Sequence, residues 1–252
     1  MKRQNHNTVK FVSTIPGVAD MFPIKLMSEH RPEWASKARA EYKKLDKSIK
    51  QNHISLCPGI FDLLKLGWYV PMWFDVYITT KKDIDGFEWK IANSALTDLA
   101  GFSIMGTHGD QIGKFIPKRD KQLDHVVKIN TPYHIIAPPD LKFLFLPMPY
   151  PEHFDWESTS GLLDPATSSE LNVQLNWNVK EGERFIKAGT PLMQIIPLSE
   201  SNINMECREA NEKELRWINK RPYFNSFSFS PIRNKIKDLY NNYFLHSQSS
   251  GQ

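Results

Sequence analysis

The sequence contains the stretch Leu171-Asn172-Val173-Gln174-Leu175-Asn176-Trp177, in which apolar and polar side chains alternate without a break. Successive side chains of a β-strand point to opposite faces, so this alternation predicts a strand with one buried face. We expect the buried face to carry Leu171, Val173, Leu175 and Trp177. Two apolar residues of a later segment, Leu192 and Ile196, are expected opposite them.

Short segments of the same kind lie on both sides of this strand. They are rich in aromatic and β-branched residues, which favour strands, and they cover residues 68–78, 87–91, 126–129, 133–136, 141–146, 161–165, 185–186 and 192–198. Turns rich in Gly and Pro recur about every eight to twelve residues, a spacing typical of a β-sandwich or β-barrel. The sequence therefore predicts a mainly β domain over residues 56–200.

Helical patterns flank the predicted β domain. Residues 1–55 form an N-terminal extension with one helix from Pro32 to about Ile49, and residues 201–252 form a helical C-terminal extension. A helix expected from Pro231 to Phe244 carries an apolar stripe on one face, made of Ile232, Ile236, Leu239, Tyr240 and Tyr243. That stripe must be covered, either by the chain's own β domain or by another subunit of a homo-oligomer.

Composition excludes several classes of protein. The 252 residues are 40% hydrophobic and 12% aromatic, which argues against disorder. The net charge of +4 is small, and the Lys and Arg residues are not concentrated in one basic stretch. Both observations argue against a nucleic-acid partner. No apolar run reaches membrane-spanning length, and no apolar segment follows the basic residues 1–7, so we expect neither a membrane protein nor a secretory signal. Two distant cysteines suit the reducing cytoplasm.

His108 and Asp110 form the most specific candidate for a metal site. Two residues spaced by one on a strand point to the same face, as metal ligands do in some β-barrel oxygenases. A third ligand for iron or zinc would come from His125, His134 or His153. The alternative is an ordinary loop, because Gly106, Gly109 and Gly113 surround the pair. Without this site, no cofactor is expected.

The loop from Pro151 to Ser160 holds the candidate ligand-binding residues. Trp156 offers a ring on which a sugar or base can stack, and His153 and Asp155 stand beside it in sequence. Long loops often carry function, but tryptophan is also a common core residue. We therefore predict Trp156, His153 and Asp155 as a possible contact set for a small molecule.

Three segments, Gly161–Pro165, Glu170–Val173 and Lys187–Ile196, resemble the core of dUTPases and dCTP deaminases in order and spacing. The resemblance implies a β-clip-like barrel or sandwich, and it aligns Asp164 with a catalytic residue that orients water. The phosphate-binding motif Arg-Ser-Gly-Leu of those enzymes would fall near Pro147–Tyr150, where it is absent. The Arg-Gly that follows the strand turn in those enzymes is replaced here by Ser168-Ser169. Asp164 precedes a proline, so it also suits a simple turn.

The chain as a whole resembles uncharacterised proteins of tailed phages, especially myoviruses of marine bacteria. The likeness lies in Ile15–Gly17, Cys57–Trp68 and Gly189–Pro197. It implies a phage-type protein in the host cytoplasm or in a virion, and it brings no activity. Together, these patterns favour a non-catalytic binding or assembly module. One alternative is a metal-dependent enzyme that uses His108 and Asp110. Another is a dUTPase-like nucleotide-binding protein that has lost its phosphate-binding motif.

Overall fold

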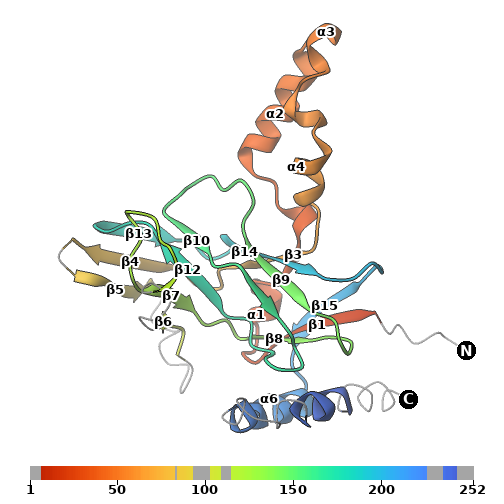
Figure 1. Cartoon of the computed structure of the whole chain (residues 1–252), viewed down its shortest axis with the longest axis vertical. Helices are drawn as coiled ribbons and strands as arrows, with labels where there is room; N and C mark the ends of the chain where they lie inside the picture. The colour runs from red at the N-terminus through yellow and green to blue at the C-terminus, as the bar shows by residue number, and fades with distance from the viewer. Residues whose placement is uncertain (1–6, 83, 93–102, 109–114, 226–234, 243–252) are drawn as a thin grey trace, which may run out of the picture.

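The computed structural model describes residues 7–82, 84–92, 103–108, 115–225 and 235–242. The fold is mainly β and sandwich-like with helical extensions, as predicted, and the described strands do not close a barrel (Figure 1). The helices are α1 (Val18–Met21), α2 (Glu33–Lys44), α3 (Lys47–Lys50), α4 (Pro58–Leu63) and α6 (Glu212–Asn225), with 3₁₀ turns η1 (Met27–Glu29) and η2 (Ile54–Leu56). No described helix is long and apolar enough to span a bilayer.

Four sheets contain the described strands. The first has the order β15 (Asn204–Glu209), β1 (Thr8–Ser13), β8 (Tyr133–Ile136). The second has the order β10 (Trp156–Ser158), β12 (Val173–Trp177), β7 (Val126–Ile129), β6 (Met105–His108). The third has the order β11 (Gly161–Leu163), β9 (Phe143–Pro147), β14 (Pro191–Pro197), β3 (Trp68–Pro71), β2 (Lys25–Leu26). The fourth has the order β13 (Gly182–Ile186), β4 (Val76–Lys81), β5 (Ile84–Ile91).

Strand β12 confirms the predicted alternation. Val173, Leu175 and Trp177 are fully buried, while the two residues between them are half-buried. The strand pairs antiparallel with β7 on one side and with β10 on the other. Its apolar face therefore joins the main core together with Leu192 of β14.

Strand β14 is buried on both faces, and Gly67 makes that packing possible. Gln194, in the middle of β14, donates hydrogen bonds to the carbonyl oxygens of Leu63 and Leu66 at 3.0 and 2.7 Å. Gly67 has a φ of 73°, and a Cβ there would lie 2.0 Å from the carbonyl oxygen of Ile195. Only glycine combines this left-handed conformation with so close an approach.

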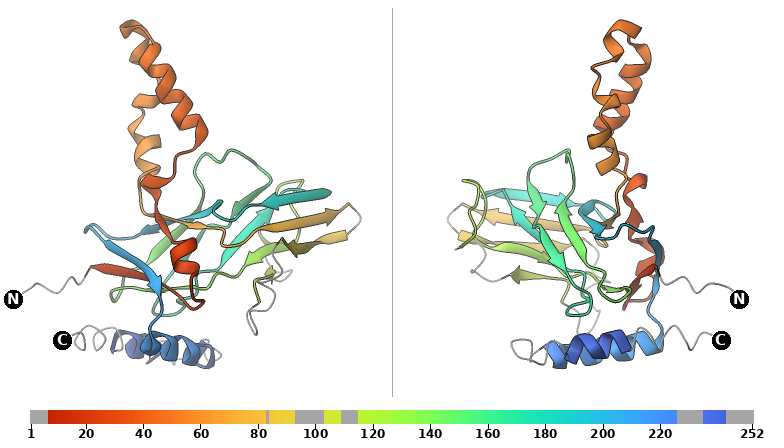
Figure 2. Two further views of the ribbon diagram at one scale, coloured as in Figure 1. Left: turned by 180° about the vertical axis from the view of Figure 1, so that it is seen from behind. Right: turned by 45° about the vertical axis from the view of Figure 1, so that its right-hand side comes forward.

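Helices α2, α3 and α4 form an arm that stands away from the β body (Figures 1 and 2). Its base rests on a small separate core, which contains Met27, Ala35, Phe61, Leu64 and Tyr69. Trp34 donates an indole hydrogen bond to the carbonyl oxygen of Tyr150 at 3.1 Å, and the rings of these two residues also meet edge to face. The arm is thus attached to the loop that precedes β10.

The segment after Ser201 corrects the prediction of a wholly helical C-terminal extension. Residues 204–209 form β15, which pairs in parallel with β1. The charged residues of this segment alternate with Met205 and Cys207, which pack against the main core. Since β1 is buried, its second edge needs a strand to complete its hydrogen bonds. The β structure therefore extends on both sides of residues 56–200, into both predicted extensions.

The C-terminal helical residues 235–242 lie on the chain's own β body. The Tyr240 hydroxyl accepts a hydrogen bond from the backbone N–H of Ala137 at 2.8 Å and donates one to its carbonyl oxygen at 3.0 Å. Ile236 and Tyr240 are buried, whereas Leu239 is 46% exposed. Ile236 and Tyr240 of the predicted stripe are therefore buried and Leu239 is not, while Ile232 and Tyr243 lie outside the described residues.

Candidate functional site

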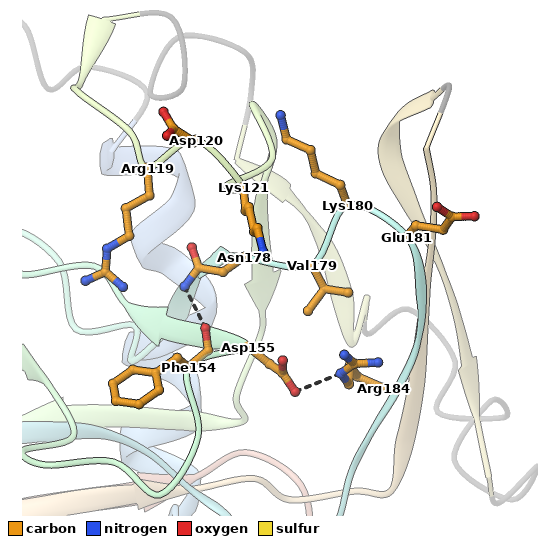
Figure 3. Close-up of a pocket in the computed structure, with 10 residues that line it drawn as sticks. All are labelled: Arg119, Asp120, Lys121, Phe154, Asp155, Asn178, Val179, Lys180, Glu181 and Arg184. Carbon is orange, nitrogen blue, oxygen red and sulfur yellow. Dashed lines mark hydrogen bonds and ion pairs between the residues drawn. The ribbon is translucent and has the colours of Figure 1, made fainter.

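Two neighbouring hollows lie where three loops meet: residues 148–155 before β10, residues 117–122 before β7, and the turn between β12 and β13. The first, which we call the depression, has a volume of about 650 Å³ (Figure 3). Its lining consists of Arg119, Asp120, Lys121, Phe154, Asp155, Asn178, Val179, Lys180, Glu181 and Arg184. It lies in the size range of ordinary small-molecule sites.

The floor of the depression is a hydrogen-bonded unit built on Asn178. Its backbone N–H donates to the carbonyl oxygen of Asp155 at 2.8 Å, and its side-chain amide donates to the carbonyl oxygen of Phe154 at 3.0 Å. Arg184 on β13 donates to the Asp155 carboxylate at 2.7 Å. Asp155, a predicted contact residue, therefore has a structural partner that ties its loop to the neighbouring strand.

Two cations reach into the depression from above this floor. Arg119 and Lys121 extend toward Asn178, whereas the carboxylates of Asp120 and Glu181 point away from it (Figure 3). Arg119 is paired with Glu157 at 2.8 Å. Lys121 has no ion-pair partner among the described residues, so its charge is free to meet a ligand.

The second hollow, which we call the slot, has a volume of about 240 Å³. It is lined by Arg119, Pro147, Met148, Pro151, His153, Phe154, Trp156, Glu157, Ser158, Pro191 and Leu192. Most of these side chains are apolar. Arg119 and Phe154 line both hollows, so the slot and the depression adjoin each other at these two residues.

Trp156 lines the slot but presents no free ring face. It stacks on Trp177 with a centroid distance of 5.5 Å and an interplanar angle of 6°, and His153 lies against it at 3.7 Å. Only 8% of Trp156 is exposed. The expectation that a ligand ring stacks on Trp156 is therefore corrected: its faces are used within the protein, and the residue contributes to the wall of the slot.

Burial lowers the pKa of His153 below its ordinary 6.5, although the carboxylates of Asp155 and Glu152 oppose the shift. The imidazole is therefore neutral at neutral pH. Its Nδ1 is buried and has no hydrogen-bond partner among the described residues. The slot thus contains a buried polar atom, Nδ1 of His153, within a mostly apolar wall.

Two further buried polar atoms near the hollows have no partner within the described chain. They are Nε1 of Trp177, which stacks on Trp156, and Oδ1 of Asn178, on the floor of the depression. A buried polar atom without a partner costs about 1–3 kcal/mol. Such atoms are usually satisfied by water or by a ligand. Three of the eight such atoms found in the described chain, on His153, Trp177 and Asn178, therefore lie at or next to these hollows.

Asp164 lines neither hollow. Its carboxylate accepts a hydrogen bond from the backbone N–H of Ala166 at 3.0 Å, and its carbonyl oxygen accepts from the N–H groups of Thr167 and Ser168. These contacts are those of a turn that follows β11, the simpler of the two predicted roles.

The proposed metal ligands are spread over the second sheet and beyond. His108 is exposed at the end of β6, and Asp110 lies outside the described residues, so this pair stays a prediction. His153 precedes β10, at the opposite edge of the same sheet. Three strand spacings separate β6 and β10, about 14 Å. Among the described residues, no three His, Cys, Asp or Glu side chains are close enough to hold a metal ion.

The other two histidines differ in their distance from His108. His134 lies on β8 in another sheet, and its Nδ1 is 3.0 Å from the hydroxyl of Ser169. His125 directly precedes Val126, the residue that pairs with His108 across β6 and β7.

Whether the contact residues expected from the sequence bind a ligand stays a prediction. The predicted contact residues Trp156, His153 and Asp155 all line one of the two hollows. Arg119, Lys121 and Asn178 were not predicted, because no local pattern shows that residues 119 and 178 meet. No family model, curated protein or solved structure matches the chain.

Proposed function

We propose that this chain is a non-catalytic binding module that holds a small ligand in the depression and the slot. The observation that carries the proposal is the set of buried, unpartnered polar atoms around these hollows, on His153, Trp177 and Asn178. Folding tolerates such atoms where a bound molecule satisfies them. The unpaired ammonium group of Lys121 adds a charge that a ligand can use.

The side chains around the hollows favour binding over catalysis. Ser158 is the one hydroxyl-bearing residue among the lining residues that the structure describes, and it donates to the carbonyl oxygen of Leu146 at 3.2 Å. His153 contacts Trp156 and has no nucleophile paired with it among these residues. A nucleophile and a base within hydrogen-bonding reach are the usual sign of covalent catalysis.

The resemblance of the sequence to tailed-phage proteins suggests where such a module acts. We propose that the module acts in a phage-infected host cytoplasm or in a virion, where it links a small ligand to assembly or to another protein. The projecting arm supports this, because a helical element that stands clear of the body is accessible to other molecules (Figure 1).

A thermal-shift screen of the full chain against small organic anions and neutral compounds tests the proposal. We expect at least one compound to raise the melting temperature, because a ligand that binds only the folded state stabilises it. For an anionic hit, the shift should be lost in Lys121→Ala and kept in Lys142→Ala, an exposed lysine that lines neither hollow. Anionic hits that are unaffected by Lys121→Ala would place their binding elsewhere, and a broad panel without hits would refute the proposal.

A further inference from the structure

The two hollows differ in chemistry. Most of the slot is walled by proline, methionine, leucine and aromatic side chains with the imidazole of His153; its polar members are Ser158 and the Arg119–Glu157 ion pair. The depression receives the ammonium of Lys121 and the guanidinium of Arg119. An apolar group is stabilised in the first and a negative charge in the second.

The size of the slot limits the apolar part of a ligand. A cavity of roughly 150 Å³ lined by apolar side chains is known to hold benzene. At about 240 Å³, the slot therefore has room for one six-membered ring with a small substituent. The prolines at positions 147, 151 and 191 give it stiff walls, which suit a flat ring better than a flexible chain.

Arg119 connects the two parts. It lines both hollows, and its pairing with Glu157 holds the guanidinium at the junction. A ligand whose ring fills the slot must pass Arg119 and Phe154 before it reaches Lys121. One molecule with a ring at one end and an anionic group at the other satisfies both hollows.

We infer that the ligand is a small aromatic ring that carries one anionic group, a carboxylate or a phosphate. The ring lies in the slot, and the anion lies between Arg119 and Lys121, above Asn178. A hydroxyl or amine near the anion would also donate to the free Oδ1 of Asn178. This inference rests on the proposed function and specifies its ligand.

Four probes test it on the full chain by isothermal titration. Phenyl phosphate and phenylacetate have both parts, inorganic phosphate has the anion alone, and benzyl alcohol has the ring alone. We expect one of the first two to bind at least about tenfold more tightly than either single-part probe. The ranking of phenyl phosphate and phenylacetate identifies the anionic group.

Three variants localise the two parts. Lys121→Ala should weaken the two-part probe about tenfold, as expected for a charged hydrogen bond, and leave benzyl alcohol unchanged. Pro151→Trp narrows the slot and should weaken the ring-containing probes while leaving inorganic phosphate unchanged. Lys142→Ala, the matched control at an exposed lysine that lines neither hollow, should change nothing. Circular dichroism spectra that overlay with the parent chain show that each variant is folded.

The outcomes separate this inference from the proposed function. If the single-part probes bind as tightly as the two-part probes, the inference is wrong while the binding site stands. If Lys121→Ala and Lys142→Ala have equal effects, the anion does not lie where we place it. If none of the four probes binds and the broad ligand screen succeeds with compounds of another class, the ligand class is wrong. If the screen also fails, the proposed function itself is refuted.

Discussion

Tyr240→Phe tests whether the C-terminal helical residues belong to the chain's own fold. The Tyr240 hydroxyl is bonded to both backbone polar groups of Ala137, a residue that is fully buried. Phenylalanine keeps the ring and its packing but leaves the N–H and the C=O of Ala137 without this partner. Each unsatisfied buried group costs about 1–3 kcal/mol. Allowing for partial relaxation, we expect the variant to lose about 2–4 kcal/mol of stability.

Native-state hydrogen exchange at the Ala137 amide measures this directly. A loss of 2–4 kcal/mol corresponds to roughly 30- to 1,000-fold weaker protection, since about 1.4 kcal/mol is a factor of ten. Leu239→Ala serves as the control because Leu239 is 46% exposed, and it should change protection by less than threefold, about 0.5 kcal/mol. Unchanged exchange at Ala137 in Tyr240→Phe would mean that this helix does not dock on the β body as described.

Three further predictions concern stability. Burial opposes ionisation of Glu214, but hydrogen bonds from Arg208 and from Asn211 outweigh it and lower its pKa; Arg208→Ala should therefore cost about 2–4 kcal/mol in urea denaturation, and a loss below 0.5 kcal/mol, about the effect of a surface substitution, would contradict this. Because burial lowers the pKa of His153, its protonation favours the unfolded chain, so the melting temperature should fall as the pH drops below 6.5. His153→Gln should reduce that fall, and an unchanged pH profile would argue against a buried neutral imidazole. A chain ending at Glu200 lacks β15 and leaves the buried β1 without its parallel partner, so we expect no cooperative unfolding transition; a truncated chain that folds would contradict this, and a full-length oligomer that becomes a folded monomer on truncation would indicate an intersubunit contact instead.

Local sequence patterns predicted elements that have one face against the core and the other toward solvent. The alternation in β12 gave the buried positions of Val173, Leu175 and Trp177, because one face of that strand meets the core and the other does not. This signal depends only on neighbours in the sequence.

Elements that depend on distant partners were not predicted. Asn204–Glu209 was assigned to a helix because its charges hid the alternation of Met205 and Cys207, and nothing local indicates that β1 lacks a partner. The site shows the same limit. Loop composition pointed to Trp156 and His153, but the contribution of Lys121 and Asn178 follows only from how the loops meet.

The central claim is that a ligand occupies the hollows beside the Trp156–Trp177 stack. Nuclear magnetic resonance of the ¹⁵N-labelled full chain, titrated with phenyl phosphate or with any hit from the ligand screen, tests it most directly. We predict saturable shifts of the Trp156 and Trp177 indole N–H signals and of the Asn178 side-chain amide, with those of Trp34 on the arm and Trp217 on α6 unchanged. Saturable shifts confined to Trp34 or Trp217, or no saturable shift at Trp177 and Asn178 with any bound compound, would contradict the account.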